Sequence, residues 1–301
     1  MKNTRAALVC YAVCLLLTCA CRTVKIEGPA PVTVHPKPAL QHVKKSVTPQ
    51  KLSAKDIPPV LGGIIQSDSW IIYKEKEQEE FSGNVSYDNG AYVFRADYAL
   101  SDRARQTFSA DGNVFLRQNN QDGSFYQAQA DRGFYNYRTQ KGTLSARGKK
   151  PVTLVYRNEK GQVITATAKQ AQFDIGQKIY VLEKNVRIER PTPQGTQVIS
   201  AQKATFKQLQ DYARLEGDAA LTDGKRTLTA DVIIYDGQND ASYAYGARPL
   251  AQGTGEQGTF AVIADQIQSD SEGNVIHLDG KVQGWLVSPQ INERTDFKTP
   301  F

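Results

Sequence analysis

The 301-residue chain is poor in the residues that usually carry covalent, redox or metal chemistry. Its four cysteines all lie within the first 21 residues, so the rest of the chain has no thiol for a disulfide. Its three histidines are His35, His42 and His277, and none has the spacing of a Cys and His zinc site. These absences predict a protein with no catalytic residue, no metal site and no cofactor.

Two further patterns resemble sites but have the wrong context. Gly253 to Gly258 fits the dinucleotide fingerprint, yet residues 259–263 have strand character where that fingerprint requires a helix. Carboxylates such as Asp97 and Asp131 recur with the repeat described below, which argues against a unique acid and base pair. We therefore expect a non-enzymatic protein, with a polysaccharide-active enzyme as the least favoured alternative.

The N-terminus has the pattern of an export signal, predicted over residues 1–20. Lys2 and Arg5 precede an apolar run at residues 6–17, which is shorter than the roughly 20 residues needed to cross a bilayer. Thr18-Cys19-Ala20-Cys21 resembles the lipobox of bacterial lipoproteins, although Thr18 stands where that family prefers Leu.

The lipobox resemblance implies lipidation of Cys21 and a membrane anchor. Cleavage before Cys19 and a plain secretory signal remain alternatives. Arg22 follows Cys21, and the absence of Asp there resembles an outer-membrane rather than an inner-membrane destination. The predicted location is therefore the periplasm, with the anchor in the outer membrane.

Residues 21–66 are predicted to be the lipidated cysteine followed by a proline-rich tether. Residues 22–66 hold seven of the thirteen prolines and have no sustained apolar period, which is typical of an extended, semi-rigid segment. A binding motif for a partner domain is the alternative. Residues 57–65 are more apolar, and we expect them to dock on the edge of the following domain.

Residues 67–301 are organised by a repeat whose units begin 29 to 38 residues apart. Each unit opens on a small residue, and a glycine follows sixteen residues later, or eighteen in one unit; Lys184 alone replaces the glycine. The small residues are Ser67, Ala96, Ala130, Ala168, Ala201, Ala230 and Ala264, and their partners are Gly83, Gly112, Gly148, Lys184, Gly217, Gly246 and Gly280.

Apolar residues around both marks recur two positions apart, which places them on one face of a strand. Turn pairs such as Asn89-Gly90, Asp122-Gly123 and Asp223-Gly224 separate the units. The pattern therefore predicts that each unit forms two half-buried strands. The sequence predicts an all-β, antiparallel, repeat-built fold of about 14 strands.

Units such as 168–174 leading to 182–186, and 230–236 leading to Gly246, resemble the repeats of the OstA-like family. That family includes proteins of lipopolysaccharide transport. The resemblance implies a V-shaped β-jellyroll of two sheets around an apolar groove, with lipopolysaccharide or a related glycolipid as ligand. It also implies edge-to-edge docking with other OstA-like domains.

The inward-facing set supplies the candidate groove residues, although each could equally fill a closed core. A structural or adhesive envelope protein without lipid cargo is the alternative function. The net charge of +6 indicates either a solvated surface or attraction to anionic partners, and no nucleic-acid partner is expected. The candidates are Trp70, Val85, Val114, Tyr135, Phe173, Val186, Phe206, Ile233, Tyr235, Ile267 and Val282.

Overall fold

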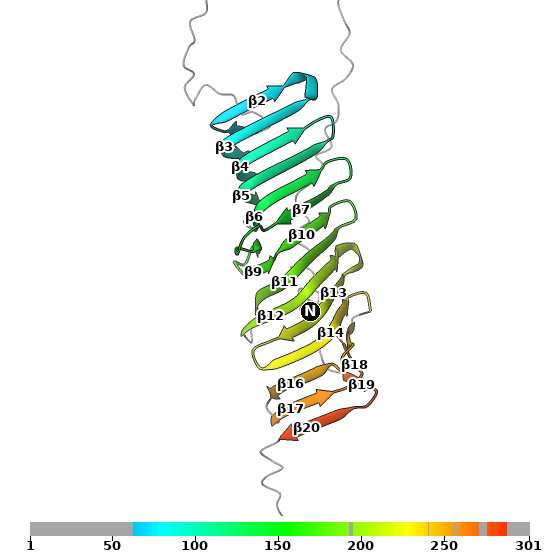
Figure 1. Cartoon of the computed structure of the whole chain (residues 1–301). Coiled ribbons are helices and arrows are strands. Elements are labelled where there is room, and N and C mark those ends of the chain that lie inside the picture. The colour runs from blue at the N-terminus through cyan, green and yellow to red at the C-terminus, as the bar shows by residue number, and fades with distance from the viewer. Residues whose placement is uncertain (1–62, 193–194, 240, 256–257, 271–275, 288–301) are drawn as a thin grey trace, which may run out of the picture.

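The computed structural model describes residues 63–192, 195–239, 241–255, 258–270 and 276–287. The predicted signal peptide, Cys21 and the tether up to residue 62 lie outside the described residues. The described part is built almost entirely of antiparallel strands, which Figure 1 shows stacked like rungs along one long axis from β2 to β20. Its helical content is two 3₁₀ turns, η1 (Lys74–Lys76) and η2 (Gln208–Gln210).

The strands fall into long and short classes. Eight long strands have 11 to 14 residues: β3 (Gln78–Asp88), β4 (Tyr92–Asp102), β5 (Thr107–Asn119), β6 (Phe125–Asn136), β11 (Ile179–Thr192), β12 (Gly195–Lys207), β13 (Tyr212–Thr222) and β14 (Arg226–Asp236). Twelve short strands complete the set: β1 (Ile64–Gln66), β2 (Ser69–Tyr73), β7 (Lys141–Ser145), β8 (Val152–Arg157), β9 (Val163–Ala168), β10 (Gln170–Asp174), β15 (Ala241–Tyr245), β16 (Leu250–Gly255), β17 (Gly258–Ile263), β18 (Gln266–Asp270), β19 (Ile276–Asp279) and β20 (Gln283–Val287).

The pairing divides the rungs into two sheets that share the long strands. Sheet A contains β2, β7, β10, β15, β18 and β19, and sheet B contains β1, β8, β9, β16, β17 and β20. One half of each long strand belongs to each sheet. In β6, for example, Arg132–Asn136 pairs with β7 of sheet A, whereas Phe125–Gln129 pairs with β8 of sheet B. This arrangement confirms the predicted all-β jellyroll.

The chain crosses from one sheet to the other at a corner. The corners coincide with the small residues and the glycines that repeat in the sequence. The pairing of β4 with β5 is interrupted between Asp111 and Phe115, where Gly112 and Asn113 have φ of 73° and 47°. The side chain of Asp97 on β4 lies against Gly112 and accepts a hydrogen bond of 2.8 Å from Asn113 Nδ2. Two consecutive left-handed residues form a bulge that bends the strand.

The same corner recurs in neighbouring units with small changes. Asp68 accepts a 2.9 Å hydrogen bond from Asn84 Nδ2 beside Gly83. Asp131 instead accepts backbone hydrogen bonds from Arg147 N at 2.6 Å and Gly148 N at 3.3 Å. These bonds lower the pKa of the Asp131 carboxyl below its usual value.

The described residues form twenty strands, so the prediction of about 14 strands was too low. The difference arises at the corners. Each traverse of the chain across both sheets is here called a pass. Six passes break at the corner into two short strands, as β9 and β10 do on either side of Lys169. The other eight passes continue through the corner as one long strand each, with a bulge in the pairing. Strand β1 also lies in the range predicted as tether and pairs with β3.

Residues between the sheets form one main buried cluster that runs from Ala96 to Ile267. Its largest fully buried side chains include Tyr180, Leu182 and Ile188. A smaller cluster of Phe81, Val85 and Ala99 lies at the N-terminal end. Among the described residues, none belongs to a helix long and apolar enough to cross a membrane.

Replacement of Gly112 by Ala tests whether the corner contributes to stability beyond the conformational cost of placing a non-glycine residue at positive φ. Gly123, with φ of 81°, has no atom within 4 Å of an added Cβ, so Gly123→Ala should lower the free energy of unfolding by only about 1 kcal/mol. Gly112→Ala should cost about 2 kcal/mol more, because the new Cβ displaces the hydrogen-bonded carboxylate of Asp97. Urea unfolding measures both, and equal losses would contradict this role of the corner.

The Asp131 corner should make stability depend on pH. Because its folded-state pKa is lowered, its contribution is present above the ordinary value of 3.8 and is lost as pH falls through the folded-state pKa. Asp131→Asn should lower the free energy of unfolding at neutral pH by about 1 kcal/mol, a value already reduced for solvent screening. Urea titrations should show this gap closing below pH 3.8, and a gap unchanged at acid pH would refute the assignment.

Candidate functional site

The main candidate site is an apolar groove of about 550 Å³ between the two sheets, in the first half of the stack. Its wall comes mainly from strands β3 to β6, and β1, β7, β8 and β10 add one residue each. The volume lies within the roughly 300–1,000 Å³ of typical ligand pockets. The apolar lining side chains are Ile65, Phe81, Val85, Val93, Phe94, Ala99, Phe108, Ala110, Val114, Leu116, Ala128, Leu144, Leu154 and Phe173.

Aromatic rings give the groove its shape. Phe94 and Phe108 meet edge to face with centroids 5.3 Å apart, across the space between the sheets. Tyr135 and Phe173 stack at 6.1 Å at the far end. Gly142 pairs with Phe173 across the strands, and the ring of Phe173 occupies the place that a Cβ at Gly142 would need. The glycine therefore lets this ring lie flat against the backbone.

Tyrosines also line the groove. They are Tyr87, Tyr92, Tyr126, Tyr135 and Tyr137. Tyrosine combines an apolar ring with a polar tip, which suits a boundary between an oily interior and water. The groove can thus accept an apolar chain and leave a polar part of the same ligand outside.

Beyond Phe173 the interior is closed by packed side chains. Tyr180 and Ala204 are fully buried, and Phe206 is 3% exposed. Tyr180 pairs with both Phe173 and Phe206, and the other neighbour of Phe206 is Ala213, where Phe173 has Gly142. The open groove is therefore confined to about half of the stack.

The predicted lining residues separate into three groups in the structure. Val85, Val114, Tyr135 and Phe173 line the groove. Val186, Phe206, Ile233, Tyr235 and Ile267 belong to or pack against the main buried cluster. Trp70 and Val282 are 51% and 48% exposed at the two ends of the stack. Their role in binding lipid stays a prediction, as does lipidation of Cys21, which lies outside the described residues.

Several lining residues were not among the predicted set. Phe94 and Ala128 lie two positions before the small residues Ala96 and Ala130, and Leu116 lies two positions after Val114. The alternation of inward and outward residues along a strand could have found them, if it had been followed for two more residues on either side of the repeat positions. Among the described residues, no group of three or more His, Cys, Asp or Glu side chains is placed to hold a metal ion.

A bulky side chain at Ala128 should fill the groove without disturbing the outer surface. Ala128 faces the groove, whereas its neighbour Gln129 is exposed on the other side of β6. Ala128→Phe should weaken binding of an apolar fluorescent dye by about tenfold, the effect of blocking about 1.4 kcal/mol of contact. Gln129→Phe is the matched control and should bind the dye like the parent protein. Equal dye binding by both variants would contradict the groove assignment.

Comparisons with known proteins give a family match for part of the chain and a structural match of low similarity. No curated protein matches the chain. A similar solved structure is LptH from Pseudomonas aeruginosa, described as the LptA-homologous periplasmic component of the conserved lipopolysaccharide transport device. The two share 12% identity with a TM-score of 0.23, over 52% of this chain and 82% of LptH.

The family comparison is more specific. Residues 107–241, from β5 to the first residue of β15, match the family described as lipopolysaccharide-assembly, LptC-related. The family description names an assembly process and no chemical reaction, in line with a non-enzymatic protein. Over residues 107–241 the chain is therefore similar to the LptC-related lipopolysaccharide-assembly family, which confirms the OstA-like resemblance predicted from the repeat.

Proposed function

We propose that this protein is a membrane-tethered periplasmic lipoprotein that binds or passes a lipopolysaccharide-like glycolipid during outer-membrane assembly. The observation that carries the proposal is the apolar groove between the sheets, lined by aromatic rings and tyrosine hydroxyls. The family match at residues 107–241 supports the same cargo class. Lipidation of Cys21 and an extended tether over residues 22–66 would hold the groove away from the outer membrane.

The need for such a groove follows from the chemistry of the cargo. Each methylene withdrawn from water is worth about 0.8 kcal/mol, so a twelve-carbon chain resists exposure by on the order of 10 kcal/mol. A cavity of about 550 Å³ is comparable with pockets that hold one drug-sized ligand. The groove therefore holds a small number of acyl chains while the sugar part stays in water.

Both ends of the stack suit docking with other OstA-like domains. At one end Trp70, Ile71 and Ile72 of β2 are 44–56% exposed, and at the other Trp285 to Val287 of β20 are 55–65% exposed. Such apolar end strands offer unpaired backbone groups to a further strand. A partner domain at either end would cover this surface and extend the stack.

A structural or adhesive envelope protein remains the second candidate function. The exposed apolar end strands, which would also join copies of a structural element, favour it. The apolar groove favours lipid binding over this second function. A purely structural stack would gain stability from an interior that is filled along its whole length, so an open groove is not expected in it.

Photo-crosslinking at adjacent positions of β5 tests the lipid proposal. Leu116 lines the groove, whereas Phe115 faces the outer side, where Arg95 lies 5.6 Å from its ring centroid. A photoreactive phenylalanine analogue at position 116 should form adducts with lipopolysaccharide in a diderm host, and the same analogue at position 115 should not. The closed-core position Phe206 is a second control. Adducts of equal yield at 115 and 116 would contradict the proposal.

A further inference from the structure

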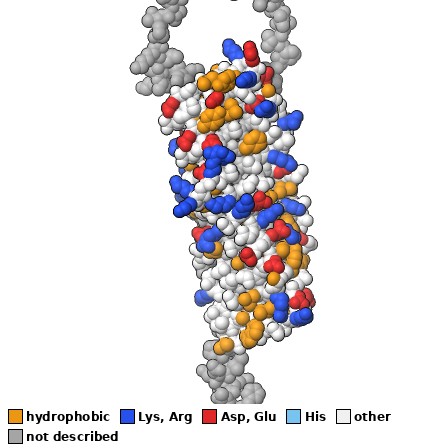
Figure 2. Space-filling view, viewed as in Figure 1, with side chains coloured by type: hydrophobic (Ala, Val, Ile, Leu, Met, Phe, Trp, Pro, Cys, Tyr) orange, Lys and Arg blue, Asp and Glu red, His pale blue; other side chains and the backbone are white. Residues whose placement is uncertain are grey.

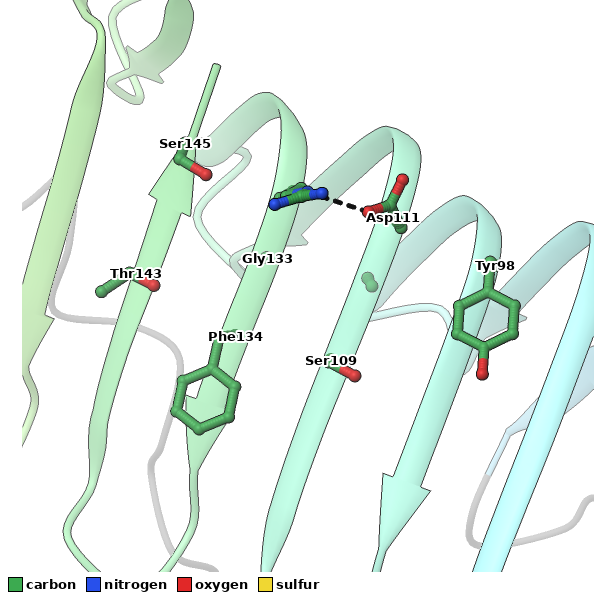
Figure 3. Close-up of a pocket in the computed structure, with 9 residues that line it drawn as sticks. Tyr98, Ser109, Asp111, Gly133, Phe134, Thr143 and Ser145 are labelled. Carbon is green, nitrogen blue, oxygen red and sulfur yellow. Dashed lines mark hydrogen bonds and ion pairs between the residues drawn. The ribbon is translucent and has the colours of Figure 1, made fainter. Parts of the chain in front are cut away.

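A second cavity of about 470 Å³ lies on the outer face of sheet A, on the opposite side of β4 to β7 from the groove. Figure 3 shows its side chains rising from neighbouring strands. The pairing places them in two rows that cross the strands. One row holds Tyr98, Asp111, Arg132 and Ser145, and the other holds Ser109, Phe134 and Thr143.

The shape of this cavity comes from an alternation of large and small side chains. Phe134 pairs with Ser109 on one side and Thr143 on the other, so its ring stands between two short hydroxyl-bearing residues. The floor is Ala110 and Gly133. Phe134 is 46% exposed, and Leu100 follows Ser109 in the same row. An aromatic ring among hydroxyl groups in a concave surface is typical of a ligand contact.

The charged side of the cavity is an ion cluster. The carboxylate of Asp111 accepts hydrogen bonds from Arg132 Nε at 3.0 Å and from Arg147 Nη1 at 2.9 Å. Because two guanidinium groups share one carboxylate, several N–H donors stay available to a ligand. The side chains of Arg132 and Arg147 are 55% and 46% exposed.

Further cations gather beside this cluster at the break between β7 and β8. Lys149 and Lys150 are exposed there, and Lys169 Nζ donates a 2.8 Å hydrogen bond to the carbonyl of Gly148. Lys169 follows Ala168 as Asp97 follows Ala96, so it holds the corner position of the aspartates. Its backbone N donates to Lys184 O at 3.0 Å, and two lysines therefore meet at this corner. Figure 2 shows Lys and Arg side chains gathered across the middle of the molecule.

The lining chemistry is selective. A sugar ring has an apolar C–H face and a rim of hydroxyls. The rings of Phe134 and Tyr98 complement the apolar face. The hydroxyls of Ser109, Thr143 and Ser145 complement the rim. The cations of this region, Arg132, Arg147, Lys149, Lys150, Lys169 and Lys184, outnumber its carboxylates, Asp97, Asp111, Asp131 and Glu183. The excess positive charge attracts an anionic group.

We propose that this outer cavity, built on Phe134 and the Asp111–Arg132–Arg147 cluster, is a binding site for an acidic saccharide that bears carboxylate or phosphate groups. The aromatic ring takes the sugar face, and the arginines and lysines take the acidic groups. The site lies on the far side of the sheet from the groove, so the inference goes beyond the proposed lipid binding and stands without it.

Titration calorimetry of the full chain with trigalacturonic acid tests this site. Maltotriose is the neutral probe, and inorganic phosphate is the probe for a bare anion. The acidic trisaccharide should bind at least about fivefold more tightly than maltotriose, the effect of one net charged hydrogen bond. Phe134→Ala and Arg132→Gln should each weaken it by about fivefold, whereas Phe134→Tyr should retain binding.

The control is Arg187→Gln, an exposed arginine paired with Glu189 elsewhere in the stack, which should leave binding unchanged. Dye binding in the groove verifies that each variant is folded and keeps the two sites separable. The proposal is overturned if no trisaccharide binds at about 10 mM, a free energy too small for a site. It is also overturned if phosphate binds as well and Phe134→Ala has no effect, or if anionic lipid vesicles bind through Lys149 and Lys150 independently of Phe134.

Discussion

The structure depends on the corner at which a polar side chain of one strand packs on a glycine of the next. Asp97 and Gly112 show its form: the glycine and the following Asn113 adopt left-handed conformations, and the carboxylate fills the space that any side chain at position 112 would need. Repetition of this corner sends each pass of the chain from sheet A to sheet B. The two sheets consequently meet along one line, and their apolar faces turn toward each other.

What lies between the sheets is decided by the size of the inward side chains, which differs between the two halves. In the first half, Gly133, Gly142 and Ala128 leave space beside Phe94, Phe108 and Phe173, and a groove remains. In the second half, Tyr180, Leu182 and Phe206 fill the interior. A uniform backbone repeat thus carries a local cavity, and the function proposed for the chain belongs to that part of the stack.

The corners, the strand pairs and the inward faces could be predicted from the sequence, because each follows from local turn residues or from the alternation of apolar and polar residues along a strand. The sequence could not separate groove from core. Phe173 and Phe206 hold the same place in the repeat, five residues after Ala168 and Ala201. Both rings pair with Tyr180 on one side, but on the other side Phe173 lies beside Gly142 and Phe206 lies beside Ala213. The residue that faces each ring on the neighbouring pass sets this difference, and the repeat pattern alone does not show which residues face each other.

The central claim is that acyl chains lie between the sheets only in the first half of the stack. Hydrogen–deuterium exchange, followed peptide by peptide while lipopolysaccharide is added, tests it most directly. Exchange should slow in residues 78–136, which form β3 to β6, and should stay unchanged in residues 179–236, which form β11 to β14. Slowing centred on residues 179–236, or no slowing anywhere while lipid is bound, would contradict the claim.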